Sequence, residues 1–205
     1  FPNDSDTLNL TGLALLAENK ISRAVEILTK AYESDKKTHI GLNLSSALIS
    51  KGELNKAKLL IKDLLELGGY SHIERLYLNL GLISERQGNT KRALVYYNKS
   101  IKENIRFYQG FIALGELYNK LTMREKSEKA FIKANKFCRV CFLPVDRLTT
   151  LYVNSGNHIK AKNILDTFTQ NKKINKNDRK KAKSLLKLVE TTNSKFIKTI
   201  KKAHQ

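Results

Sequence analysis

The chain has 205 residues, 41% of them hydrophobic, and carries a formal net charge of +19. Nowhere do roughly 18 apolar residues run together, so the sequence predicts no membrane span. The 38 Lys and Arg residues, against 19 Asp and Glu, make an acidic protein, an anionic membrane or a nucleic acid the candidate partners of its basic surfaces.

A pair of small residues twelve positions apart occurs five times, and the pattern returns every 33 to 36 residues. A period in this range predicts helical hairpins that bury their apolar faces against one another. Small side chains at these points would let the two helices of a hairpin approach closely. The pairs, in chain order, are Gly12/Ala24, Ser45/Ala57, Gly81/Ala93, Gly115/Ser127 and Thr149/Ala161.

Turn signals divide each hairpin into two helices. Gly52, Gly88 and Gly156 each follow a helical run, which is where a helix commonly stops, and Asn19 lies at the equivalent point of the first hairpin. The fourth hairpin has Thr122 there, which we expect to cap the next helix. The sequence therefore predicts ten helices of about 13 to 16 residues, with one or two more after Lys176 and no strands.

The third and fourth hairpins carry a recognisable spacing of aromatic, Leu-Gly and small residues. It runs through Tyr77, Leu80, Gly81, Ala93, Tyr97 and Ser100, and again through Phe111, Leu114, Gly115, Tyr118, Ser127, Phe131 and Ala134. This spacing resembles the tetratricopeptide repeat family. The first hairpin lacks the aromatic residues and no hairpin ends in the family's Pro, which indicates a divergent member. The abundance of Lys, Asn and Ile favours a bacterial source.

The resemblance implies an all-α fold, a right-handed α-solenoid of about five helical hairpins with a C-terminal capping helix. Within residues 1–171, the expected repeats span about 4–36, 37–70, 71–106, 107–140 and 141–171. A basic capping helix and tail would occupy 172–205. Such a cap is required because the last hairpin would otherwise expose its core face.

In this family the first helix of each hairpin lines a concave groove, so the resemblance implies recognition of a protein or peptide there. Leu and Ile would anchor the ligand, while Glu85, Glu116 and Asp146 would make the C-terminal half acidic and favour a basic ligand. The alternative is that several of these side chains complete the packing between hairpins. The expected groove residues are Leu13, Leu16, Leu42, Ile49, Leu78, Leu82, Glu85, Ile112, Glu116 and Asp146.

Two basic surfaces stand apart from this groove. One is a helical stripe at Lys126, Lys129, Lys133 and Lys136, which is either a solvated face or a contact for phosphate groups. The other follows Thr191, where apolar Phe196 and Ile200 alternate with the basic residues Lys195, Lys198, Lys201 and Lys202. Its two faces would suit an acidic protein or an anionic membrane surface. No nucleic-acid-binding motif accompanies either surface, so nucleic acid is not favoured.

Sites for chemistry are not evident. There is no metal-ligand spacing, phosphate-binding loop or nucleophile motif, so we expect no enzyme, no cofactor, no metal and no small-molecule ligand. Cys138 and Cys141 lie between the fourth and fifth hairpins. We expect packing thiols, and a local disulfide is the alternative if the compartment is oxidising.

The preferred hypothesis is a non-catalytic protein-interaction scaffold in a bacterial envelope or secretion-related complex. The alternative is a basic adaptor that binds nucleic acid or an anionic membrane through its Lys-rich C-terminal segment. Because the chain begins at Phe1 without Met, we expect that a segment before it has been removed. The expected location is periplasmic or membrane-anchored through that segment, and otherwise cytoplasmic.

Overall fold

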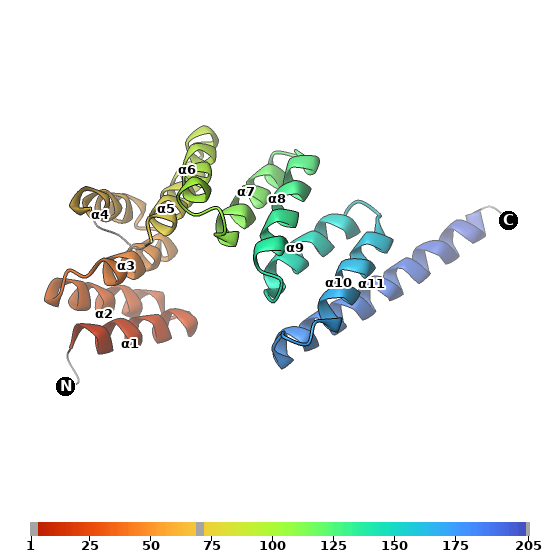
Figure 1. The fold of residues 1–205 in the computed structure, drawn as a ribbon, viewed down its shortest axis with the longest axis horizontal. Coiled ribbons are helices and arrows are strands. Elements are labelled where there is room, and N and C mark those ends of the chain that lie inside the picture. The colour runs from red at the N-terminus through yellow and green to blue at the C-terminus, as the bar shows by residue number, and fades with distance from the viewer. Residues whose placement is uncertain (1–3, 69–71, 204–205) are drawn as a thin grey trace. The chain divides into compact units, whose positions relative to one another are not determined.

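The computed structural model describes residues 4–68 and 72–203, with side chains described as far as Thr191. In these ranges it contains eleven α-helices and no strand, as the sequence predicts. The chain divides into two compact units, residues 1–105 and 106–205 (Figure 1). Each unit is a stack of helices from consecutive hairpins, which is the construction of a helical solenoid.

The first unit holds three helical hairpins. Its helices are α1 (Ser5–Ala17), α2 (Ile21–Ser34), α3 (Thr38–Lys51), α4 (Leu54–Leu67), α5 (Ile73–Arg86) and α6 (Thr90–Glu103). Consecutive helices pack against each other within each hairpin, and the first helices also contact one another, α1 with α3 and α3 with α5. The core between the two rows includes the fully buried side chains of Leu28, Ile61 and Leu64.

The second unit holds two hairpins and a final long helix. Its helices are α7 (Tyr108–Lys120), α8 (Arg124–Phe137), α9 (Phe142–Val153), α10 (His158–Gln170) and α11 (Lys176–Ala203). α11 packs on α10 and α9 (Figure 1), and it buries Ala182 and Val189 there. It therefore covers the core face of the last hairpin, which is the role expected of a cap. Of the one or two helices expected after Lys176, the structure has one, because α11 continues past Thr191.

The hairpin turns need a residue with positive φ. Gly52, Gly88 and Gly156 supply it at φ values of 88°, 75° and 72°, with no atom near enough to hinder a side chain. Asn19 and Thr122 adopt φ of 59° in the other two hairpins. Thr122 is therefore the turn residue, and the expectation that it caps α8 is wrong, because Met123 occupies the N-cap position.

Close helix crossings account for the small residues of the repeat. A Cβ atom added at Gly81 would lie under 3.0 Å from the ring of Tyr97, and one added at Gly115 would meet Phe131 equally closely. On the opposite helices Ala24, Ala93 and Ala161 are fully buried, as is Ser127, whose hydroxyl donates to the Gly115 carbonyl at 2.8 Å. The small residues therefore let large side chains fill the space between paired helices.

None of the helices in the described part of the chain is both long and apolar enough to cross a bilayer.

Candidate functional site

The first helices of unit 1 are joined by amide side chains. Asn43 of α3 donates to the Asn9 side-chain oxygen of α1 at 2.9 Å. Asn79 of α5 donates to the hydroxyls of Ser45 and Ser46 of α3 at 2.9 and 3.0 Å. These bonds fix the spacing of the three helices, so the face that they form is defined before any ligand binds. Sequence reasoning passed over Asn43 and Asn79, although Asn recurs at intervals of 34 and 36 residues in the first three repeats, at Asn9, Asn43 and Asn79.

The apolar residues expected in the unit 1 groove fall into two groups. Leu13 is 37% exposed and Leu78 and Leu82 are half-buried, so their side chains offer surface to a ligand. Leu16 is half-buried against the hydrophobic core, and Ile49 is only 4% exposed. For Ile49 the packing alternative holds.

A cavity of about 250 Å³ opens between the N-terminal ends of α3 and α5. Leu42 lies at its base with 2% of its surface exposed. Lys37 stands at its edge between Asp6 and Asp35, with nitrogen–oxygen distances of 2.9 and 3.0 Å. The hydrogen bonds to Asp6 and then Asp35 raise the pKa of Lys37 to about 12. The other lining residues are Thr38, His39, His72 and Leu76.

Glu85 is held within its own hairpin. Its carboxylate accepts a hydrogen bond from the hydroxyl of Tyr97 at 2.7 Å. The neighbouring Arg86 donates to the backbone carbonyl of Ile49 on α3. The end of α5 is thus a polar contact within unit 1, and Glu85 is a half-buried acceptor there rather than an isolated surface charge.

Unit 2 has a cavity of about 290 Å³ between its first helices, α7 and α9. Arg147 dominates its charge, because its Nε donates to Glu116 at 2.6 Å and its Nη1 donates to Asp146 at 2.7 Å. Ile112 on α7 is only 5% exposed and belongs to the packing. The cavity is lined by Glu116, Asn119, Lys120, Phe131, Arg147, Thr150, Leu151 and Asn154.

The pairing by Arg147 changes the expected electrostatics. Glu116 and Asp146 were predicted to attract a basic ligand, yet one guanidinium neutralises much of both charges. Sequence reasoning missed Arg147, and its only signal was its place directly after Asp146. The α7–α9 surface is therefore polar and nearly balanced in charge.

The four lysines of the predicted stripe on α8 have different surroundings. Lys126 lies over the ring of Tyr118 at 5.7 Å and Lys133 over the ring of Phe111 at 5.6 Å, where each makes a cation–π contact. Lys129 is exposed, and Lys136 lines a cavity between α8 and α10. The remaining basic residues of the prediction, Lys195, Lys198, Lys201 and Lys202, lie outside the residues whose side chains are described.

Cys138 and Cys141 form a disulfide with their Cα atoms 5.3 Å apart, a separation typical of such bonds. The expectation of packing thiols is therefore wrong and the alternative holds. The bond joins the C-cap residue of α8 to the N-cap residue of α9. Among the described residues, no three His, Cys, Asp or Glu side chains gather closely enough to hold a metal ion.

Comparison with known proteins gives the class. The tetratricopeptide repeat family model matches residues 74–104, which cover α5 and α6. No curated protein sequence matches the chain at a significant level. The described fold and this match together define a helical repeat protein.

Three solved structures show the likeness in fold. TTC0263, a thermophilic tetratricopeptide repeat protein of Thermus thermophilus, has a TM-score of 0.70 and 18% identity over 89% of this chain and 98% of its own. PilW, a type IV pilus biogenesis factor, has a TM-score of 0.66 and 15% identity over 88% and 83%. MamA has a TM-score of 0.54 and 16% identity over 83% and 92%. Residues 74–104 therefore carry a tetratricopeptide repeat, and the likeness to these structures shows that the chain shares their helical-repeat fold.

Proposed function

We propose that the chain is a non-catalytic scaffold that binds a protein or peptide partner along the first helices of its hairpins. The observation that carries this proposal is the presence of a cavity between neighbouring first helices in each unit, about 250 Å³ between α3 and α5 and about 290 Å³ between α7 and α9. Each is lined by apolar and hydrogen-bonding side chains together, which is the composition of a recognition surface.

In unit 1 the proposed ligand is an extended or helical peptide with apolar anchors. Leu13, Leu78 and Leu82 provide partly exposed apolar surface, and burying such surface supplies most of the affinity at a peptide groove. The amide of Asn43, half-buried on α3, can bond a peptide backbone. Leu16 and Leu42 would support these anchors from beneath.

In unit 2 the proposed contact is polar. The guanidinium of Arg147 lies between Glu116 and Asp146, and Asn119 and Lys120 complete the rim. A surface with both signs of charge selects a ligand by matching geometry more than by net charge. We therefore propose a polar stretch of the partner here, in place of the basic ligand that the carboxylates alone would favour.

The proposed setting is a bacterial envelope or secretion-related complex. PilW, described as a type IV pilus biogenesis factor, has the same fold over 88% of this chain. The disulfide between Cys138 and Cys141 also suits an oxidising compartment such as the periplasm.

A second candidate function is a basic adaptor that binds an anionic membrane or a nucleic acid through the C-terminal helix. The favouring observation is the exposed lysine row of α11, which includes Lys180, Lys183 and Lys187, on the side away from buried Ala182 and Val189. Phosphate contacts of this kind weaken steeply as salt rises, whereas apolar contacts do not.

The test begins with capture of partners from a nuclease-treated lysate of the source cells at about 0.1 and 0.5 M salt, a range that strongly screens exposed charges. The partner retained at both salt concentrations is then purified and titrated against two variants. Leu13→Glu places a charge on the first-helix face and should weaken binding roughly tenfold. Leu10→Glu is the matched control, because Leu10 is 66% exposed on the same helix and outside the predicted groove.

The two functions give opposite results with a variant in which Lys180, Lys183 and Lys187 are each replaced by Gln. Groove binding should survive this replacement and be weakened in Leu13→Glu, whereas the adaptor function should be weakened in the triple Lys→Gln variant alone. Equal weakening by Leu13→Glu and Leu10→Glu would contradict the assignment of Leu13 to the binding face of α1.

A further inference from the structure

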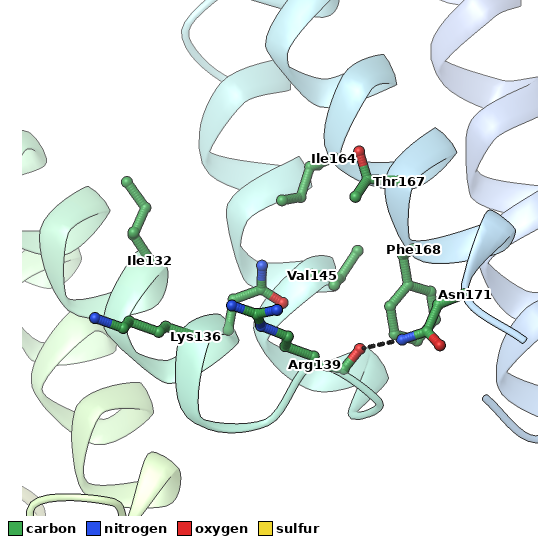
Figure 2. A pocket seen from close by; sticks show the side chains of 9 residues that line it. Ile132, Lys136, Arg139, Val145, Ile164, Thr167, Phe168 and Asn171 are labelled. Carbon is green, nitrogen blue, oxygen red and sulfur yellow. Dashed lines mark hydrogen bonds between the residues drawn. The ribbon is translucent and has the colours of Figure 1, made fainter. Parts of the chain in front are cut away.

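A third cavity, of about 410 Å³, lies between the second helices of unit 2. Figure 2 shows Ile132 and Lys136 on the α8 side, Ile164, Thr167 and Phe168 on the α10 side, and Val145 of α9 between them. Its volume is within the range of ligand-binding pockets, and it exceeds that of either first-helix cavity. It is therefore a surface distinct from the one assigned above.

The charge of this cavity has one sign. Lys136 and Arg139 line it, together with Asn135 and Asn171, and none of its nine lining residues carries a carboxylate. In Figure 2 the Arg139 side chain runs from the α8–α9 loop into the space between Lys136 and Val145, while the Lys136 ammonium points away from Phe168. Arg139 is thus the inner cation and Lys136 a flanking one.

The backbone that carries Arg139 is held at two points. The disulfide between Cys138 and Cys141 closes the short loop that contains it. The side-chain amide of Asn171 at the end of α10 donates to the Arg139 carbonyl at 3.2 Å, the dashed line in Figure 2. Asn171 is held in place as well, because its backbone carbonyl accepts a hydrogen bond from the Arg179 guanidinium of α11 at 2.9 Å. A cation whose backbone is held in this way loses less conformational entropy when it pairs with an anion.

The apolar side of the cavity is also held in place, because it is formed largely by packed residues. Val145 and Phe168 are buried core residues, and Ile132 keeps 47% of its surface exposed at the mouth. Phe168 also contacts the ring of Phe142 at 6.0 Å between centroids. An apolar side chain that enters here meets a preformed surface, which favours burial of an aromatic or large aliphatic group.

We propose that this cavity binds a short peptide segment of a partner protein in which an acidic residue lies next to a large apolar one. The carboxylate pairs with Arg139, with Lys136 adding charge at the rim, and the apolar side chain packs on Val145, Ile164 and Phe168. The side-chain amide of Asn135 has both a donor and an acceptor for the peptide backbone between them. The disulfide acts as a positioning element, because it holds the loop that presents Arg139.

Fluorescence anisotropy with the full chain tests the proposal. The probe is a labelled hexapeptide Gly-Ser-Asp-Phe-Ser-Gly, and the control probes carry Asn in place of Asp or Ala in place of Phe. We expect saturable binding of the first probe with a Kd on the order of 10 to 100 μM, and about tenfold weaker binding of each control probe.

Matched variants locate the site. Arg139→Gln should weaken binding of the Asp-Phe probe about tenfold and leave binding of the Asn-Phe probe unchanged, because the lost interaction is the ion pair. Arg124→Gln makes the same charge change at the other end of α8, where Arg124 is exposed, and should have less than about a twofold effect. Ile164→Ala should weaken binding, whereas Ile159→Ala, at a residue 72% exposed on the same helix, should not.

A paired Cys138→Ser and Cys141→Ser variant tests the loop. It should bind the Asp-Phe probe about three times more weakly than the parent chain, because the loop must be ordered on binding. An unchanged affinity would overturn the positioning role of the disulfide. Absence of saturation up to about 1 mM probe, or equal effects of Arg139→Gln and Arg124→Gln, would overturn the site itself.

Discussion

Replacing Gly81 by Ala should destabilise the protein, although Ala is the better helix former. A Cβ at position 81 would lie under 3.0 Å from two atoms of the Tyr97 ring, far inside ordinary van der Waals contact. Tyr97 is fully buried and its hydroxyl is bonded to Glu85 at 2.7 Å. The ring therefore cannot swing aside without losing a hydrogen bond and disturbing the core around it.

Two opposing effects set the change in the free energy of unfolding caused by Gly81→Ala. Ala in place of Gly within a helix stabilises by about 1 kcal/mol. Overpacking a rigid core contact costs about 1 to 3 kcal/mol, and the crowding here favours the upper part of that range. The net loss is about 2 kcal/mol. For a chain of this length each kcal/mol moves the melting temperature by about 2 to 4 °C, so we expect a fall of about 4 to 8 °C.

Circular dichroism melts of four proteins measure this effect: the parent chain, Gly81→Ala, Tyr97→Leu and the double variant. Tyr97→Leu removes the ring that meets the new Cβ, so the double variant should lose at least about 1 kcal/mol less than the sum of the single variants. A Gly81→Ala protein that melts at or above the parent temperature would refute the reasoning, because helix propensity would then outweigh the crossing. Strict additivity would show that the Tyr97 ring is not the cause.

Three further predictions concern charge. Arg147→Gln removes the cation that pairs with Glu116 and Asp146, so affinity for a Lys-rich probe peptide should rise in anisotropy titrations. The free energy of unfolding in urea should change by less than about 1 kcal/mol. An unchanged affinity would contradict the neutralising role of Arg147. Burial, and then the hydrogen bond to Glu128, raise the pKa of Tyr152 to about 12. Because an unfolded Tyr ionises near pH 10, stability should fall between about pH 10 and 12, less so in Tyr152→Phe, and equal urea-midpoint profiles would contradict this. Lys51 and then Lys56 lower the pKa of Glu53 to about 2. The stability that the ionised Glu53 adds is therefore present above pH 4.5 and lost as the pH falls toward 2. An NMR titration should show that Lys51→Met raises the pKa of Glu53, and a midpoint near 4.5 in the parent chain would be inconsistent with these ion pairs.

The helical part of the fold was predictable because its determinants are local. Gly52, Gly88 and Gly156 end helices through a backbone conformation that other residues adopt at a cost, and the small residues recur at the crossings because close approach excludes a Cβ. Thr122 shows where this reasoning fails. A Thr three residues before a Glu has the pattern of a cap, yet the turn required positive φ at that position and used the Thr for it.

The continuous course of α11 shows a second limit of local patterns. Thr191, Thr192 and Asn193 have weak helix propensities, so the sequence pattern alone left either one or two helices open after Lys176. The described side chain of Thr191 donates to the carbonyls of Lys187 and Leu188 in the preceding turn. A hydroxyl that bonds back in this way is satisfied within the helix, so the Thr side chain does not require the helix to end there.

The site residues were less predictable, because one period describes both packing and recognition. Ile49 and Leu82 both lie on first helices and were both predicted to line the groove, yet Ile49 is buried and Leu82 keeps exposed surface. The difference depends on which side chains neighbouring helices place over each position, a contact between residues far apart in the sequence. The same holds for charge, since Glu116 is neutralised by Arg147 from the next hairpin, 31 residues away. A groove predicted from periodicity is therefore an upper bound on the surface accessible to a ligand. Of the apolar groove residues predicted in unit 1, those that keep the most exposed surface are Leu13, Leu78 and Leu82.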